Sequence, residues 1–176
     1  EISNLDSTTY TKRFSVYVTD ANGVAVGNQP VSLSVIPNTY GKGTLSWNST
    51  ASLWVYTLGS PTTCQNEDSN GNGILDAAED FNGNGRLTSG NVVVASPGNV
   101  TTDAVGRAYF DLQYGEQYAP WANVQIRARA AVAGTESISV TDFALVGLAS
   151  DFNQEGVAPA GARSPFGTVA SCSNPN

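Results

Sequence analysis

Oxygen-bearing side chains alternate with small or apolar residues in one acidic segment of the chain, residues 68–79. The positions that carry the pattern are Asp68, Asn70, Asn72, Gly73, Ile74, Asp76 and Glu79. A hard cation such as Ca2+ takes about six to eight oxygen ligands, which alternate residues of a tightly wound loop can supply. Gly73 permits the sharp turn that brings the Ile74 carbonyl round. Asp76 can bind directly or through water, and Glu79 can close the site with both oxygens. The spacing therefore predicts one bound calcium ion.

The pattern restarts at once in residues 80–91, which repeat the Asp-x-Asn-x-Asn-Gly-x-Leu core. The candidate ligands of this repeat are Asp80, Asn82, Asn84, Arg86, Thr88 and Asn91. Thr88 and Asn91 stand where the first segment has acids, which leaves Asp80 as the only carboxylate. A second ion would need a neighbouring carboxylate, and the available ones are Glu67, Asp76 and Glu79. Two interpretations stay open: a second calcium ion, or a repeat that only rigidifies a hairpin.

Residues 68–79 resemble an EF-hand loop at every side-chain ligand position. Because the two segments abut, there is no room for the exiting helix of an EF-hand or for the helical linker of a dockerin. The arrangement over residues 66–91 is more similar to the back-to-back calcium loops of thrombospondin type 3 repeats. A calcium sensor that opens a groove needs such helices. We therefore expect a permanent structural calcium that millimolar extracellular levels keep filled.

Composition narrows the classes of function. The chain of 176 residues has 15 acidic and 8 basic side chains, and its net charge of -7 disfavours nucleic acid as a partner. Five of the 15 acids fall between residues 67 and 80, which is typical of a cation site. There is no histidine, so the commonest general base and zinc ligand are absent. We expect no enzyme, although paired acids such as Asp111 and Glu116 could in principle do acid–base work.

The two cysteines, Cys64 and Cys172, have no partners at metal-ligand spacing and predict one structural disulfide in an oxidising compartment. The apolar runs, such as residues 143–149, are too short to span a bilayer, so we expect no membrane insertion. No signal segment opens the chain, which looks like a mature or excised piece of a longer secreted protein. The expected location is extracellular or at the cell surface, with the periplasm as an alternative.

Apolar residues alternate with polar ones over much of the chain, which is the period of half-buried strands. The segments with this pattern are residues 14–18, 31–35, 108–114 and 124–129, and further strands are expected at 45–47, 53–58, 92–94 and 138–145. Phe143 and Leu145 are out of phase with Ile138 and Val140, which predicts a bulge near residues 141–142. The fold class is therefore all-β, a β-sandwich of about seven to nine strands.

The expected organisation is a single domain over residues 1–176. Residues 64–91 form its calcium-binding insertion. Residues 147–176 lose the alternating pattern and predict a C-terminal coil that the disulfide tethers.

Two parts of the sequence also resemble a known family. Phe14-Ser-Val-Tyr-Val-Thr-Asp-Ala-Asn-Gly23, followed by Gln29-Pro-Val-Ser-Leu-Ser-Val35, resembles the opening strands of bacterial Ig-like domains of the invasin and intimin type (group 1). Thr102-Asp-Ala-Val-Gly-Arg-Ala-Tyr-Phe110 resembles a later hairpin of the same modules. The similarity covers residues 13–36 and 101–146, and it implies that the fold is an Ig-like β-sandwich. Family members form rods or tips of surface adhesins, which implies attachment or spacing, with neighbouring Ig-like domains and a host or neighbouring-cell receptor or glycan as partners.

The leading hypothesis is thus a non-enzymatic, calcium-stabilised extracellular module of a bacterial surface or secreted protein, which acts in adhesion or as a structural spacer. The alternative is a carbohydrate-binding accessory module of a secreted enzyme. Its stacking platform would come from the aromatic residues Trp47, Trp54, Tyr56 and Trp121.

Overall fold

The structure, a computed structural model, describes all 176 residues, and 44% of them lie in eleven antiparallel strands and two isolated bridges. One sheet has the order β1 (Ile2–Asn4), β2 (Thr9–Tyr17), β9 (Arg107–Gly115) and β7 (Val93–Ser96). The second has the order β11 (Thr135–Ala144), β10 (Ala122–Val132), β3 (Pro30–Lys42) and β6 (Thr62–Gln65), with β8 (Asn99–Thr101) paired to β3. A separate hairpin contains β4 (Leu45–Asn48) and β5 (Leu53–Tyr56). The all-β prediction is confirmed.

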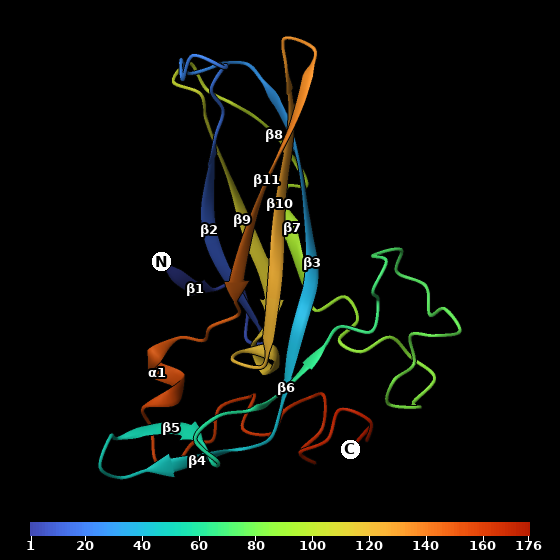
Figure 1. Ribbon diagram of the computed structural model, residues 1–176. Helices are drawn as coiled ribbons and strands as arrows, with labels where there is room; N and C mark the ends of the chain where they lie inside the picture. Colours follow the sequence, from blue (N-terminus) through green and yellow to red (C-terminus); the bar gives the residue numbers. More distant parts are fainter.

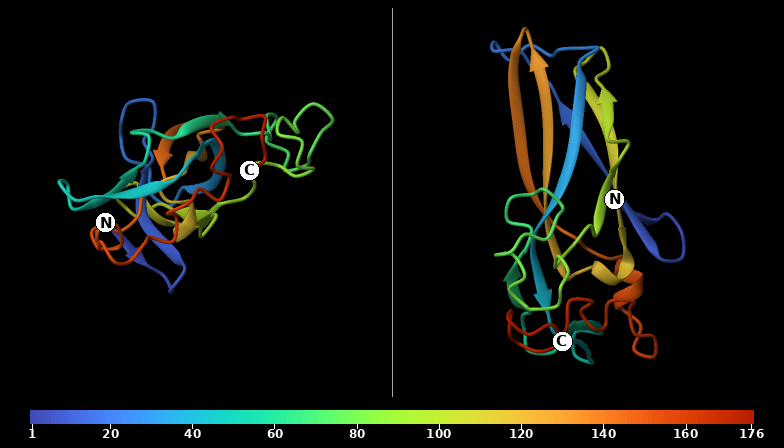
Figure 2. Two further views of the ribbon diagram at one scale, coloured as in Figure 1. Left: turned by 90° about the horizontal axis from the view of Figure 1, so that it is seen from below. Right: turned by 90° about the vertical axis from the view of Figure 1, so that its right-hand side faces the viewer.

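The two larger sheets enclose one hydrophobic core, as expected of a β-sandwich (Figures 1 and 2). Alternate residues of β9 are buried, among them Phe110 and Leu112, and β10 and β3 contribute Val124 and Val31 from the other side. Burial of each such side chain contributes about 1.5 to 3 kcal/mol, which fixes the face that each strand turns inward. The predicted alternation in these strands is therefore confirmed.

The expected bulge at residues 141–142 is wrong. β10 and β11 pair without interruption from Asn123 opposite Ala144 to Val132 opposite Thr135. The phase change arises because Ile138 and Val140 face solvent, whereas Phe143 packs against the core. The irregularity in this sheet lies between β10 and β3 instead. The strand number also exceeds seven to nine, because β1, β6 and β8 are too short to show an alternating pattern.

The C-terminal segment runs beneath the sheets, beside the β4–β5 hairpin (Figure 1). It contains one short helix, α1 (Ala149–Phe152), where the sequence indicated only coil, and a 3-10 turn, η1 (Glu116–Tyr118), lies earlier in the chain. The rest of the segment is held by backbone bonds, such as those from Leu45 N to the Ala162 carbonyl and from Ser164 N to the Gly43 carbonyl. No helix of the chain is long and apolar enough to cross a membrane.

Gly161 packs closely against residues that lie outside this segment. A Cβ atom there would lie 2.6 Å from the carbonyl oxygen of Ala119 and 3.2 Å from the indole nitrogen of the buried Trp121, which donates to the Gly161 carbonyl. We expect Gly161→Ala to lower the free energy of unfolding by about 1 to 3 kcal/mol through overpacking. Gly156→Ala is the matched control, since a Cβ there meets nothing within 4 Å. Urea unfolding of both variants tests this, and equal stabilities would contradict it.

Candidate metal centre

The chain leaves the second sheet at the end of β6 and returns to the first sheet at β7. Residues 66–92, between these strands, contain no helix or strand and lie beside the lower half of the sheets (Figure 1). The two predicted loops occupy this excursion. We call residues 68–79 the first loop and residues 80–91 the second loop.

Side-chain oxygens and backbone N–H groups wind the first loop tightly. Asp68 accepts from the N–H groups of Asn72 and Gly73, both at 3.0 Å. Asn70 accepts from the N–H of Asn72 at 2.9 Å, and Asn72 accepts from that of Ile74 at 2.7 Å. Gly73 has a φ of 74°, in the left-handed region where glycine carries no steric penalty. These bonds place the oxygens of the three alternate side chains on the inside of one turn.

The same side chains converge on a single carboxylate. The side-chain amides of Asn70 and Asn72 lie 2.8 and 3.1 Å from the same Oδ2 atom of Asp76. Each amide oxygen accepts one backbone bond and keeps a second lone pair. Two amides and two carboxylates, Asp68 and Asp76, therefore share one small space, which is the donor set that Ca2+ prefers.

The second loop repeats this geometry. Asp80 accepts from the N–H groups of Asn84 at 2.9 Å and Gly85 at 3.0 Å. Asn82 accepts from Asn84 at 3.0 Å, and Asn84 accepts from the N–H of Arg86 at 2.8 Å. Gly85 has a φ of 73°, nearly that of its counterpart in the first loop. The sequence repeat is thus a structural repeat.

Thr88 stands in the second loop where Asp76 stands in the first. The side-chain amides of Asn82 and Asn84 lie 2.9 and 3.1 Å from its hydroxyl oxygen. The second loop therefore has a neutral oxygen where the first has a charged one, and it needs a carboxylate from elsewhere to match the first.

Each loop is closed by a buried glutamate. In the first loop, Glu79 accepts from the N–H of Ser69 at 2.9 Å and from that of Asp76 at 3.1 Å. In the second, Glu67 accepts from the N–H of Asn82 at 3.1 Å and from that of Thr88 at 2.8 Å. The two carboxylates bridge nearly the same positions of their loops. Glu67, which precedes both loops, thus supplies the second loop with the carboxylate that its own sequence lacks.

Both glutamates are nearly inaccessible to solvent: Glu67 is 0% exposed and Glu79 is 3% exposed. The two ion pairs of the chain lie elsewhere, between β2 and β9 and between β10 and β11. Neither glutamate therefore has a basic side chain within 4.0 Å. A buried carboxylate without a cationic partner is costly, because it has lost its hydration.

The hydroxyl of Ser69 and, next, the backbone N–H of Asp76 lower the pKa of Glu79. A carboxylate whose folded pKa lies below the unfolded value stabilises the fold at pH values above the unfolded pKa. This stabilisation is lost as the pH falls through the folded pKa. The first loop is therefore held more firmly at neutral pH than in acid.

Eleven of the twelve predicted ligand positions take part in the hydrogen bonds of the two repeated turns, and Asn91 takes part in none of them. Asn91 lines a hollow together with Asp68, Gly73 and Leu75 of the first loop. No group of three or more Asp, Glu, Cys or His side chains has the geometry of a metal site. Three of the six predicted ligands of the first loop are carboxylates, whereas Asp80 is the only one among those of the second loop.

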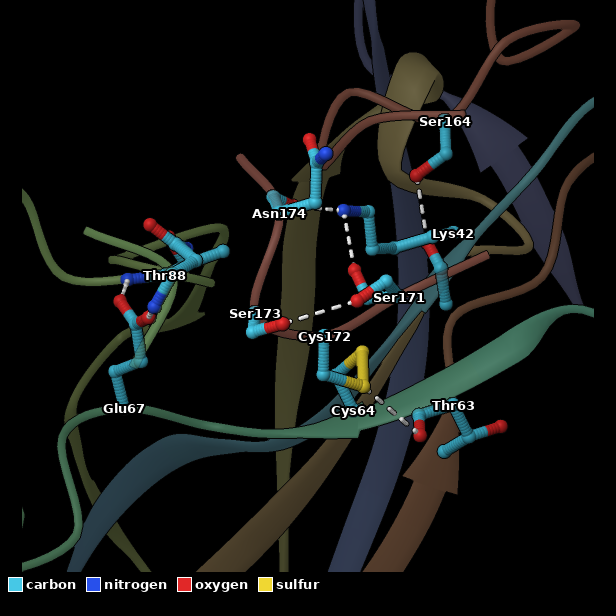
Figure 3. Close-up of a disulfide and its surroundings, with 12 residues drawn as sticks. Lys42, Thr63, Cys64, Glu67, Thr88, Ser164, Ser171, Cys172, Ser173 and Asn174 are labelled. Atoms are coloured by element: carbon cyan, nitrogen blue, oxygen red, sulfur yellow. Dashed lines mark hydrogen bonds between the residues drawn. A yellow bond between two sulfur atoms is a disulfide. The ribbon is translucent and has the colours of Figure 1, made fainter. Parts of the chain in front are cut away.

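The predicted disulfide is present and lies beside the loops. Cys64 of β6 and Cys172 of the C-terminal segment are bonded, with a Cα–Cα distance of 5.6 Å (Figure 3). Nearby, the buried Lys42 donates to the carbonyl oxygens of Ser171 and Asn174. Because Cys64 precedes Glu67 by only three positions, the bond fixes the end of β6, from which the chain passes to Glu67.

The aromatic residues considered for sugar stacking are engaged in packing. Trp121 is 1% exposed, and the indole of Trp54 donates to the Gln154 carbonyl at 2.9 Å. The hydroxyl of Tyr56 donates to the Pro120 carbonyl at 3.0 Å. The ring of Trp47 meets that of Trp54 edge to face.

The two carboxyl groups weighed for acid–base work have separate environments. Asp111 accepts from the guanidinium of Arg13, which lowers the pKa of the Asp111 carboxyl. Glu116 lies in η1, where burial and then the nearby Asp151 raise its pKa.

Comparison with protein-family models, with curated proteins and with solved structures finds no match to this chain.

Proposed function

We propose that residues 67–91 bind two calcium ions and that the chain is a calcium-stabilised extracellular module. The observation that carries the proposal is the pair of buried glutamates, Glu67 and Glu79, each without a basic partner and each beside an Asp-Asn-Asn turn. A divalent cation at each turn would supply the missing positive charge.

The residues that would hold the ions follow from the two turns. The first ion would be held by Asp68, Asn70, Asn72, the Ile74 carbonyl, Asp76 and Glu79. The second would be held by Asp80, Asn82, Asn84, the Arg86 carbonyl, Thr88 and Glu67. Both sets contain only oxygen atoms, which suits Ca2+ better than a transition metal.

The role of the ions in this proposal is structural. The excursion between β6 and β7 has no helix or strand of its own, and its backbone is organised by side-chain oxygens. Bound calcium would make it rigid without the helices through which a sensor acts. An Ig-like sandwich with a disulfide and a rigid side loop suits a spacer or adhesive unit of a bacterial surface or secreted protein.

Thermal unfolding in chelator and in millimolar calcium tests the proposal. We expect calcium to raise the melting temperature, because an ion that binds only the folded state stabilises it by about 2.7 kcal/mol at a hundred times its dissociation constant. Limited proteolysis should cleave residues 66–91 faster in chelator. Magnesium is the control cation and should protect poorly, since it dehydrates reluctantly and requires near-octahedral geometry. Identical melting curves in chelator and calcium would refute calcium binding.

A further inference from the structure

The second sheet ends in a long strand with a free edge. β11 has ten residues, pairs with β10 along its whole length and has no strand on its other side. Figure 2 (right) shows it at the border of the sheet. The other edge strands of the two sheets, β1, β6, β7 and β8, have only three or four residues. β11 is therefore the longest free edge strand of the domain.

The backbone groups that point away from this edge can be assigned. Leu145 donates to the Ala122 carbonyl, and the pairing continues in the same register. Hydrogen-bonded and outward-pointing residues alternate in an antiparallel strand. Residues 136, 138, 140 and 142 therefore turn their N–H and C=O groups outward, and none of these groups bonds to a loop or side chain.

Two of these four outward-pointing residues, Ile138 and Val140, carry exposed apolar side chains. Ile138 is 48% exposed and Val140 is 51% exposed, on the face of the sheet that turns away from the core. Edge strands are commonly protected by proline, lysine, a bulge or a covering loop. β11 contains no proline or lysine and pairs with β10 without a bulge.

We propose that β11 is a homodimerisation edge, which pairs antiparallel with β11 of a second copy of the chain about a two-fold axis at Ser139. In this register Ile138 of each copy lies opposite Val140 of the other, and the outward N–H and C=O groups of both residues are paired. An edge that pairs about a two-fold axis must be complementary to itself. Here the axis generates two equivalent apolar pairs, each of them Ile138 of one copy opposite Val140 of the other. The second copy is also the one partner certain to present a free strand of matching length.

The register centred on Ser139 has one unfavourable feature, which provides a further test of it. Glu136 of each copy lies opposite Asp142 of the other, and like charges directly opposite each other weaken strand pairing. Arg129 lies 3.2 Å from Glu136 and offsets part of this repulsion. Removal of the charge at Asp142 should therefore strengthen the dimer.

Light scattering coupled to size exclusion, over a range of protein concentrations in calcium, tests the proposal. The mass of the intact chain should rise with concentration from 18.3 kDa toward twice that value. Val140→Lys should remain monomeric, because the two-fold axis would bring two lysines close together beside the apolar pairs. The matched control is Tyr109→Lys, which places the same charge at a 51% exposed residue of the other sheet and should dimerise as the wild type does.

Asp142→Asn should dimerise at a several-fold lower concentration than the wild type. A wild-type chain that stays monomeric at every concentration, or dimerisation unchanged in Val140→Lys, would overturn the proposal. A several-fold weaker dimer in Asp142→Asn would overturn the Ser139-centred register. Circular dichroism of each variant verifies that the fold is kept.

Discussion

Replacement of Cys172 by serine is expected to lower the free energy of unfolding by about 4 to 5 kcal/mol. The bond between Cys64 and Cys172 closes a loop across a sequence separation of 108 residues. In the chain-entropy model, a closed loop of about 100 residues restricts the unfolded chain by roughly 4.7 kcal/mol. Denaturant unfolding of the oxidised wild type and of Cys172→Ser measures the difference directly.

The same variant should bind calcium more weakly. The disulfide fixes the end of β6, from which the chain passes directly to Glu67, and Glu67 bridges Asn82 to Thr88. Without the bond, the C-terminal segment is held at this point mainly through the contacts of Lys42. Calcium must then order a more mobile loop as it binds, and this ordering reduces the net free energy of binding.

Ser173→Ala is the control for this experiment, because the Ser173 hydroxyl bonds only to that of the neighbouring Ser171. It should leave both stability and affinity unchanged. Peptide mapping without reductant should recover Cys64 and Cys172 in one linked fragment. Two free thiols, or a Cys172→Ser protein with wild-type stability and calcium affinity, would disprove the coupling.

The strands could be predicted from the sequence wherever one face of a strand is buried and the other is exposed to solvent. Alternation in residues 108–114 and 124–129 reports that difference directly, and β9 and β10 follow it. The same reasoning predicted a bulge in β11 that is absent, because Ile138 and Val140 are apolar but lie on the outer face. A sequence pattern shows the polarity of the side chains, but it does not show which face of a sheet is exposed to solvent.

The turns of the candidate metal centre could be predicted because their interactions are local. Asp68 and Asp80 each bond to backbone groups four and five positions ahead, and glycines permit the left-handed conformation within each turn. The closing carboxylate of the second loop is not local. Glu67 reaches groups 15 and 21 positions away, so the sequence showed it only as one of three acids available to a second ion.

The disulfide was predictable for a different reason. With only two cysteines in the chain, a disulfide within the chain has a single possible pairing, whatever the fold between them. What the sequence did not show is that this bond would lie next to the lysine-bound end of the C-terminal segment. That contact depends on the path of residues 147–176 beneath the sheets.

Glu67→Gln and Glu79→Gln are each expected to weaken the binding of one of two calcium ions, which is the largest change in binding that single substitutions in the loops should cause. Each variant keeps the shape of the side chain and removes its charge. Charge-assisted contacts contribute about 1.5 to 3 kcal/mol, and about 1.4 kcal/mol corresponds to tenfold in affinity. The affinity of the affected site should therefore fall by roughly tenfold or more.

Calorimetric titration with calcium resolves the two sites by stoichiometry, and the double variant should bind neither ion tightly. Asn91→Ala is the decisive control. Asn91 occupies the twelfth position of the second loop in sequence, yet Glu67 is the residue that accepts from Asn82 and Thr88 in the structure. If Asn91 closes the second site, Asn91→Ala will lose an ion and Glu67→Gln will keep both, which would disprove the assignment of Glu67. If Glu67 closes it, Asn91→Ala will bind two ions with wild-type affinity, because its side chain contributes nothing to either turn.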